Sequence, residues 1–157
     1  METLAPTSTC RYTTIHVTTQ RPTEFIDLTE RLEALVAGAG IRFGFANVQS
    51  LHTTAGIVVN EHEPLLLADF ATLLEHAAPC TACYRHDDQT VRTGNVMGDG
   101  RINGHSHCRA LLLGPSACLN VIDGRLQLGR WQRVFLAELD GPRAREISVL
   151  ILGADRP

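Results

Sequence analysis

The sequence predicts an α+β fold with a largely antiparallel sheet, and three observations support this prediction. The 157 residues are 44% hydrophobic and 20% charged, which is typical of one soluble globular domain. Runs rich in β-branched residues are separated by turn signals through much of the chain. Two amphipathic helical patterns interrupt these runs, one early and one midway. We therefore expect a single domain spanning residues 1–157.

The first half of the chain alternates between extended and helical patterns. Residues 11–20 are rich in Thr, Ile and Val, which favours a strand. Pro22 marks a helix start, and apolar residues then recur at helical spacing over 22–38 before two glycines end the pattern. Residues 41–50 and 56–60 predict two short strands, the second a continuous apolar run typical of a buried strand.

The second half begins with a helix and ends in hairpins. An apolar pattern predicts a helix over 64–76, and a polar, glycine-containing stretch over 84–104 predicts a long loop. Residues 106–113 have the spacing of a short helix. The remaining turn signals lie at 123–124 and 140–142, so we expect hairpins built from strands 117–122, 125–129, 131–139 and 144–153. Trp131 is expected in the core.

Composition excludes several functional classes. All fourteen basic residues are arginine, so Schiff-base chemistry and a lysine base are excluded, and a phosphate would be held by arginine, backbone amides or metal. A net charge of −3 gives no basic footprint for general nucleic-acid binding. No apolar run approaches the roughly 18 residues that span a bilayer, so we expect no membrane insertion.

The cysteines indicate a reducing environment. There are five, an odd number, and residues 1–6 lack the features of an export signal. We therefore expect a cytoplasmic protein without a disulfide framework, in which the cysteines are buried as small hydrophobic residues. Cys80 and Cys83 have the spacing of half a zinc site, but a second close pair is missing.

Three short segments concentrate histidines beside small and polar residues, and we expect them to converge. His52 precedes two threonines, His86 precedes two aspartates, and His107 follows a segment of the chain that is rich in glycine. Three imidazoles brought together could hold a divalent metal, zinc or magnesium, with an open position that polarises an oxygen or generates hydroxide. The candidate catalytic and metal-binding residues are therefore His52, His86 and His107.

Neighbouring polar residues extend the candidate site. Glu61 ends a buried strand and is a candidate metal ligand or acid–base group, whereas Asp87 could fix the tautomer of His86. Arg109 could join the free amides near His107 in binding an anion. The full set of candidate substrate-binding residues is Thr53, Asn60, Arg85, Asp87, His105, Ser106, Arg109 and Gln132.

Five motifs carry a family resemblance. They are LHTTAG at 51–56 followed by Asn60 and Glu61, YRHD at 84–87, NGHSH at 103–107, LGPS at 113–116, and DGRL at 123–126 followed by GRWQ at 129–132. In this order, and over nearly the whole chain, they resemble the YjbQ family, often called secondary thiamine-phosphate synthase. Arg130 stands where the wider family often has a hydroxyl residue.

The resemblance implies a sandwich of antiparallel sheets and assembly as a homotrimer. It also implies an enzyme that joins a hydroxymethylpyrimidine diphosphate to a thiazole phosphate with release of pyrophosphate, either as its main reaction or as a side activity. Charge on the departing pyrophosphate would then be stabilised by Arg85, Arg109, amides near His107, or a magnesium held by Glu61 and Asp87. A metal-dependent hydrolase and a non-catalytic module that binds an anion or metal are the alternatives.

Overall fold

A computed structural model describes residues 8–95 and 100–155 of the chain, and the predicted α+β class is confirmed. The opening residues 1–6, on which the expected location partly rested, lie outside the described part. The helices of the described part are α1 (Thr29–Ala39), α2 (Pro64–Ala77), α3 (Gly104–Leu113) and the short 3₁₀ turn η1 (Arg85–Asp87). Its strands are β1 (Ser8–Thr18), β2 (Glu24–Asp27), β3 (Phe43–Ser50), β4 (Ala55–Glu61), β5 (Ser116–Ile122), β6 (Arg125–Leu126), β7 (Gln132–Glu138) and β8 (Ala144–Ala154).

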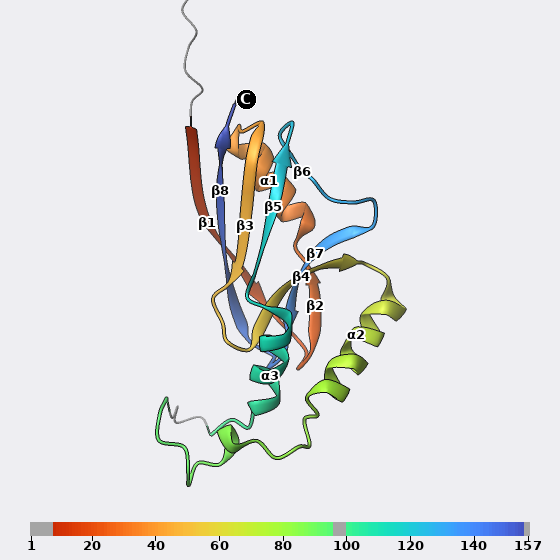
Figure 1. Ribbon diagram of the computed structural model, residues 1–157, viewed down its shortest axis with the longest axis vertical. Coiled ribbons are helices and arrows are strands. Elements are labelled where there is room, and N and C mark those ends of the chain that lie inside the picture. The colour runs from red at the N-terminus through yellow and green to blue at the C-terminus, as the bar shows by residue number, and fades with distance from the viewer. Residues whose placement is uncertain (1–7, 96–99, 156–157) are drawn as a thin grey trace, which may run out of the picture.

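The strands form two antiparallel sheets (Figure 1). The larger has the order β1-β8-β3-β5-β6, and the smaller has the order β2-β7-β4. The predicted hairpin across Asp123 and Gly124 is confirmed, because β5 pairs with β6 there. The predicted hairpin at 140–142 is wrong, because β7 and β8 pair in different sheets. The turn residues predicted the chain reversal, but they carry no information about which sheet receives the next strand.

Four short connections therefore cross from one sheet to the other, and one of them joins β6 to β7. The other three follow β1, β3 and β7, and they join these strands to β2, β4 and β8, respectively. The connections also touch one another: the Thr19 amide donates to the Arg143 carbonyl at 2.9 Å, and the Arg145 guanidinium donates to Thr54 Oγ1 at 3.1 Å. The crossing points after β1, β3 and β7 consequently gather at one end of the sandwich, which is the end that carries the candidate site.

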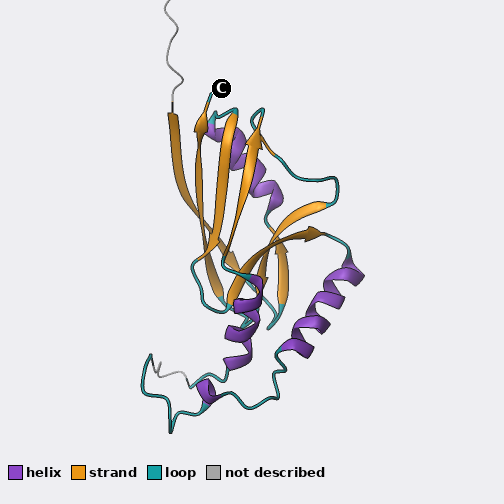
Figure 2. Ribbon diagram, viewed as in Figure 1, coloured by secondary structure: helices purple, strands orange, loops and turns teal. Residues whose placement is uncertain are grey.

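The core lies between the larger sheet on one side and α1 with the smaller sheet on the other (Figure 2). Alternation along β8 places Ile147, Val149 and Ile151 inward, as expected for a strand with one buried face. Leu32 and Val36 of α1 meet them from the other side. Gly40 ends α1 in the left-handed conformation with φ 71°, which glycine adopts without steric cost.

The helix predicted over 22–38 begins later than expected. Residues Glu24–Asp27 pair with β7 as a strand, and α1 starts at Thr29, whose amide donates to Asp27 Oδ1 at 2.8 Å. The apolar spacing from Phe25 to Leu32 fits a helix, but Phe25 packs against Phe70 of α2 from the strand. Pairing with a buried partner strand outweighed the local helical pattern here.

Helices α2 and α3 lie beside the smaller sheet at the lower end of the molecule (Figure 1). Leu74, Ala110 and Leu139 bring α2, α3 and the end of β7 into a second apolar cluster. The Glu63 carboxylate caps α2 by accepting hydrogen bonds from the amides of Leu65 and Leu66. Helix α3 begins two residues earlier than the predicted 106–113, and the predicted loop over 84–104 contains η1.

Two further expectations are wrong because side chains predicted to be buried are exposed. All five cysteines are free and exposed, since those in strands and in α3 point away from the core. Trp131 is 61% exposed, because it lies in the loop before β7. Its ring stacks with the guanidinium of Arg130, whose Cζ lies 4.7 Å from the ring centroid. Within the described residues, no helix combines the length and apolar character needed to cross a membrane.

Candidate active site

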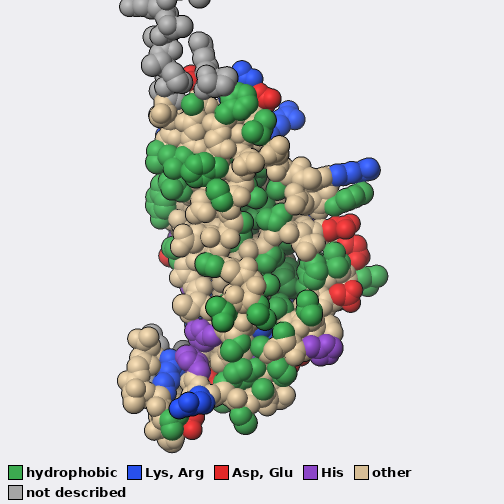
Figure 3. Space-filling view, in the orientation of Figure 1, with side chains coloured by type: hydrophobic (Ala, Val, Ile, Leu, Met, Phe, Trp, Pro, Cys, Tyr) green, Lys and Arg blue, Asp and Glu red, His purple; other side chains and the backbone are tan. Residues whose placement is uncertain are grey.

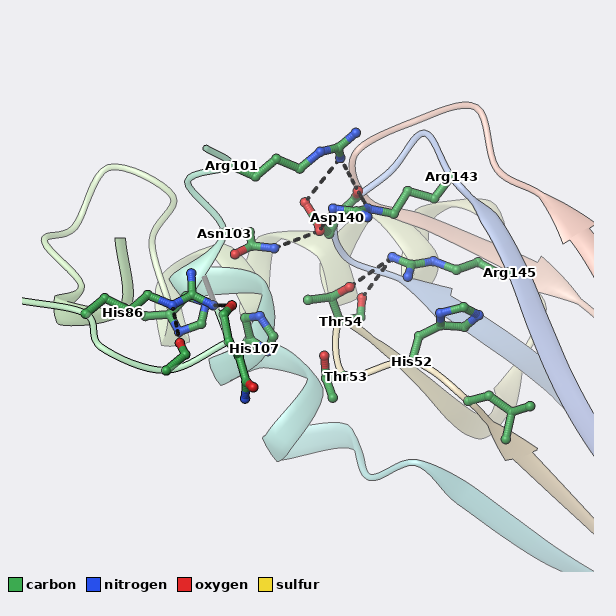
Figure 4. Close-up of a pocket in the computed structure, with 14 residues that line it drawn as sticks. His52, Thr53, Thr54, His86, Arg101, Asn103, His107, Asp140, Arg143 and Arg145 are labelled. Atoms are coloured by element: carbon green, nitrogen blue, oxygen red, sulfur yellow. Dashed lines mark hydrogen bonds and ion pairs between the residues drawn. The ribbon is translucent and has the colours of Figure 1, made fainter. Parts of the chain in front are cut away.

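A cavity of about 700 Å³ opens at the end of the sandwich where the crossing connections meet (Figure 4). Its walls come from the loop before β4, the loop and η1 before α3, the first turn of α3, and the connection from β7 into β8. Histidine and arginine side chains gather at this end of the surface (Figure 3). The described lining residues are Leu51, His52, Thr53, Thr54, His86, Arg92, Gly94, Asn95, Arg101, Asn103, His107, Asp140, Arg143 and Arg145.

His86 and His107 form one wall of the cavity. Their ring centroids lie 4.5 Å apart, although the residues are separated by the whole glycine-containing loop. Burial lowers the pKa of His107, and the neighbouring His86 lowers it further because two imidazolium ions would repel each other. His107 is therefore neutral near pH 7, and a bound anion would favour its protonated form.

Asp87 and Gly104 hold this histidine pair in place. The Asp87 carboxylate accepts hydrogen bonds from the amides of Asn103 and Gly104 at 3.0 and 2.8 Å, so it caps α3 and ties η1 to it. A Cβ at residue 104 would lie 2.5 Å from Tyr84 Cβ, so only glycine allows this close approach. Asp87 thus fixes the position of its neighbour His86 and does not line the cavity itself.

The floor of the cavity contains a buried ion pair between Glu138 and Arg145. Glu138 is fully buried, and its carboxylate accepts from the Arg145 guanidinium, Thr19 Oγ1 and the amides of Leu139 and Asp140. Burial alone would raise the pKa of Glu138, but these hydrogen bonds and the Arg145 charge outweigh it and lower the pKa. Because Glu138 belongs to the smaller sheet and Arg145 to the larger, the pair joins the two sheets under the cavity.

Asp140 organises a second group of cations at the rim. Its Oδ2 accepts from Asn103 Nδ2 at 2.9 Å and from Arg143 Nη2 at 2.7 Å, while Arg101 Nη1 lies 3.9 Å from Oδ1 (Figure 4). Asp140 is the single acidic residue among the described lining residues, against four arginines. The cavity therefore carries a surplus of positive charge from side chains that are already held in place.

His52 reaches the cavity from the loop that crosses between the sheets. Its Nε2 accepts a hydrogen bond from the Glu146 amide at 2.8 Å. Burial lowers the pKa of His52, and the positive charge of Arg145 lowers it further. Thr53 lines the cavity beside it, so the structure brings four predicted site residues (His52, Thr53, His86 and His107) to one cavity.

Three other predicted site residues lie away from the cavity. Strand β4 starts beside it and carries Asn60 and Glu61 to the opposite end, where Glu61 pairs in register with Gln132. Asn60 Oδ1 accepts from the Glu61 amide, and Gln132 Oε1 accepts from the Gly129 amide at 2.7 Å. The side chains of Asn60 and Gln132 thus make local hydrogen bonds with the backbone, away from the cavity.

The remaining predicted binding residues surround α3 without lining the cavity. Arg109 is buried, pairs with Glu75 and donates through Nε to the Ala78 carbonyl, so it ties α3 to the end of α2. Ser106 Oγ donates to the Leu139 carbonyl at 2.5 Å. His105 packs near Tyr84, and its buried Nδ1 has no partner among the described residues. Arg85 opens η1 and is exposed.

The sequence matches a known protein family over most of its length. Residues 13–154 match the model of the YjbQ family, which is described as "UPF0047 protein YjbQ-like". The chain belongs to the YjbQ family. A curated relative, the UPF0047 protein of Methanothermobacter thermautotrophicus, is 42% identical over 135 residues, which cover 86% of this chain and 87% of the relative. YugU of Bacillus subtilis is 31% identical and covers 89% of this chain and 98% of its own.

Solved YjbQ-like structures show the same architecture. A YbjQ-like protein of Sulfolobus solfataricus superposes with a TM-score of 0.84 at 34% identity, covering 94% of this chain and 99% of its own. A protein of Aeropyrum pernix K1 superposes with a TM-score of 0.81 at 31% identity, and the match covers 91% of this chain and 98% of that protein.

Several residues of the YjbQ site that the structure reveals had no direct signal in the sequence. Charged residues interrupt the otherwise apolar end of β7 and start of β8, and this was the available signal for Glu138, Asp140, Arg143 and Arg145. Arg92, Arg101 and Asn103 lie in the long loop, where polar residues are ordinary and carry little information.

The YjbQ cavity does not present a ready metal site among its described residues. No group of three His, Cys, Asp or Glu side chains is close enough to hold an ion there. His52 Nε2 is occupied by the Glu146 amide, and the Asp140 carboxylate is occupied by Asn103 and arginines. The three histidines thus share a cavity but do not form the predicted set of metal ligands in this conformation.

Proposed function

We propose that this protein is an enzyme acting on a small phosphorylated substrate bound in the cavity. The observation that carries the proposal is that the described residues line the cavity with four arginines and three histidines around a single, already paired carboxylate. Guanidinium groups bind phosphate oxygens in fixed geometry, and a cavity of about 700 Å³ has the size of ordinary small-molecule sites. A small phosphorylated molecule is therefore the ligand class that the charges favour.

The specific reaction we propose is that of a secondary thiamine-phosphate synthase. The bond between the pyrimidine methylene carbon and the diphosphate oxygen breaks, and the thiazole nitrogen forms a bond to that carbon. Pyrophosphate leaves with the electron pair, so negative charge grows on its oxygens. Arg143 and Arg145 are held by Asp140 and Glu138, so they can stabilise this charge without reorganising. The attacking nitrogen loses no proton, so the histidines need not act as bases.

Pyrophosphate binding gives the first test. We expect isothermal titration to show binding that weakens with added salt, because it depends on arginine–phosphate contacts. Arg143→Gln removes a charge-assisted contact worth about 1.5–3 kcal/mol, so its affinity should fall at least about tenfold. Arg130→Gln, an exposed change outside the cavity, should leave affinity unchanged.

A synthase assay with the two phosphorylated substrates completes this test. Formation of thiamine phosphate by the wild-type protein, reduced in Arg143→Gln, supports the proposal. Pyrophosphate binding without turnover would indicate a binding module, and turnover only as metal-dependent hydrolysis would indicate a hydrolase. Absence of pyrophosphate binding would refute the proposed ligand class.

We also propose that the chain assembles as a homotrimer that buries the outer face of the larger sheet. This face carries the exposed side chains of Tyr12 (66% exposed), Phe45 and Ile122. The half-buried Leu152 of β8 lies on the same face, where it pairs with Phe45 of β3 on one side and with β1 on the other. Hydrophobic side chains gather there at the upper left of Figure 3. Large exposed apolar patches are uncommon on monomers and typical of interfaces.

Light scattering after size exclusion would measure the assembly. We expect three chain masses for the wild-type protein and a smaller particle for Phe45→Glu. Ala37→Glu, at an exposed position on α1, is the control that should leave the mass unchanged. A monomeric wild-type protein would contradict the proposed assembly. The five free thiols support a cytoplasmic location as part of the proposal.

A further inference from the structure

The backbone of β8 determines which nitrogen of His52 carries the proton. The segment before β4 pairs with Glu146 twice: the Leu51 amide donates to the Glu146 carbonyl at 3.1 Å, and the Glu146 amide donates to His52 Nε2 at 2.8 Å. A backbone amide can only donate a hydrogen bond, so Nε2 must offer its lone pair. The proton of the neutral ring therefore resides on Nδ1.

The Nδ1 side of the ring is open to a ligand. Among the described residues no atom forms a hydrogen bond with Nδ1, and this nitrogen is not among the buried unpartnered atoms of the structure. His52 lines the cavity together with Arg145 and Thr54, and the three lie near one another in Figure 4. Because Nδ1–H and the guanidinium are both donors, the complementary group is an acceptor such as a phosphate oxygen.

We infer that His52 is a neutral hydrogen-bond donor to an oxygen of the bound anion, oriented by the Glu146 amide. It is then neither a general base nor a metal ligand, since Nε2 is occupied and Nδ1 carries a proton. Burial of the ring and the Arg145 cation beside it both oppose protonation, in agreement with this role. The inference deepens the proposed function, because it assumes that the cavity binds a phosphorylated ligand.

Nitrogen-15 NMR of the ring tests the tautomer without any ligand. We expect the His52 spectrum at pH 7 to show a protonated Nδ1 and an unprotonated Nε2. A protonated Nε2, or a doubly protonated ring at this pH, would overturn the inference. This measurement does not depend on whether the protein has synthase activity.

Two substitutions test the acceptor role of Nε2 and the donor role of Nδ1 separately. The side-chain oxygen of His52→Gln can accept from the Glu146 amide, but the variant lacks a donor at the Nδ1 position. The amide of His52→Asn places a donor near the Nδ1 position and leaves the Glu146 amide unpaired. We expect His52→Gln to bind inorganic pyrophosphate about ten- to a hundredfold more weakly with little change in melting temperature. His52→Asn should melt earlier and keep more of the affinity.

The exposed His76→Gln on α2 is the matched control and should change neither quantity. Pyrophosphate affinity of His52→Gln within twofold of the wild-type value would refute the donor role. If the wild-type protein itself binds no pyrophosphate, the proposed ligand class fails, whereas the NMR result still decides the tautomer.

Discussion

Glu138→Gln is expected to lower the free energy of unfolding by about 3–5 kcal/mol, because it leaves the buried Arg145 cation without its counter-ion. Arg145 is only 2% exposed and donates twice to this carboxylate, so water cannot replace the lost partner. The amides of Leu139 and Asp140 also lose a charged acceptor. Chemical denaturation followed by circular dichroism would measure the change.

The pH dependence of this loss provides a second readout. The pKa of Glu138 is lowered in the folded protein, so its charged form contributes stability above the unfolded value of about 4.5. That contribution disappears as the pH falls through the folded pKa, and the two proteins should then converge in stability. Glu146→Gln, an exposed change next to Arg145 on β8, should stay within about 0.5 kcal/mol of the wild-type protein. A loss below about 1 kcal/mol in Glu138→Gln would contradict the importance of the buried pair.

Gly104→Ala should damage both stability and ligand binding. The new methyl group would meet Tyr84 Cβ at 2.5 Å and Asp87 Oδ2 at 3.1 Å, so η1 must move away from α3. We expect a loss of about 1–3 kcal/mol in unfolding free energy, as for overpacking elsewhere. Because His86 moves with η1, pyrophosphate affinity should also fall, and calorimetry of the folded variant would detect this.

Gly38→Ala is a matched control for this substitution. Gly38 lies in α1 with nothing within 4 Å of the added Cβ, so alanine should stabilise the protein slightly by favouring the helix. Equal stability changes in the two variants would show that the contact between residue 104 and Tyr84 is unimportant.

Local patterns predicted most elements of this fold. Strands β1, β3, β4 and β5 and helix α2 followed from alternation, apolar runs and proline positions. The start of α1 did not, because the spacing of Phe25, Leu28 and Leu32 fits a helix equally well, and only pairing with β7 decides against it. The distribution of β7 and β8 between two sheets is likewise a property of long-range packing.

The candidate site was predictable to the extent that its chemistry is concentrated in short segments. His52, His86 and His107 stood out because imidazoles are rare and lay beside turn residues. Arg145 and Glu138 did not, since a charged residue in a strand is ordinarily solvated, and only the packing of two sheets reveals that these two are buried together. Arg109 looked equally suited to an anion, yet it lies against Glu75.

Three inter-sheet connections meet at one end of the sandwich, so binding of a molecule in the cavity is coupled to the stability of the whole domain. A molecule that contacts Arg145 on β8 together with Thr54 before β4 touches both sheets at once. Opening of a single loop would not release all its contacts, so its free energy of association adds to global stability. The end of the sandwich that is richest in buried charge is then also the part that a bound molecule reinforces most.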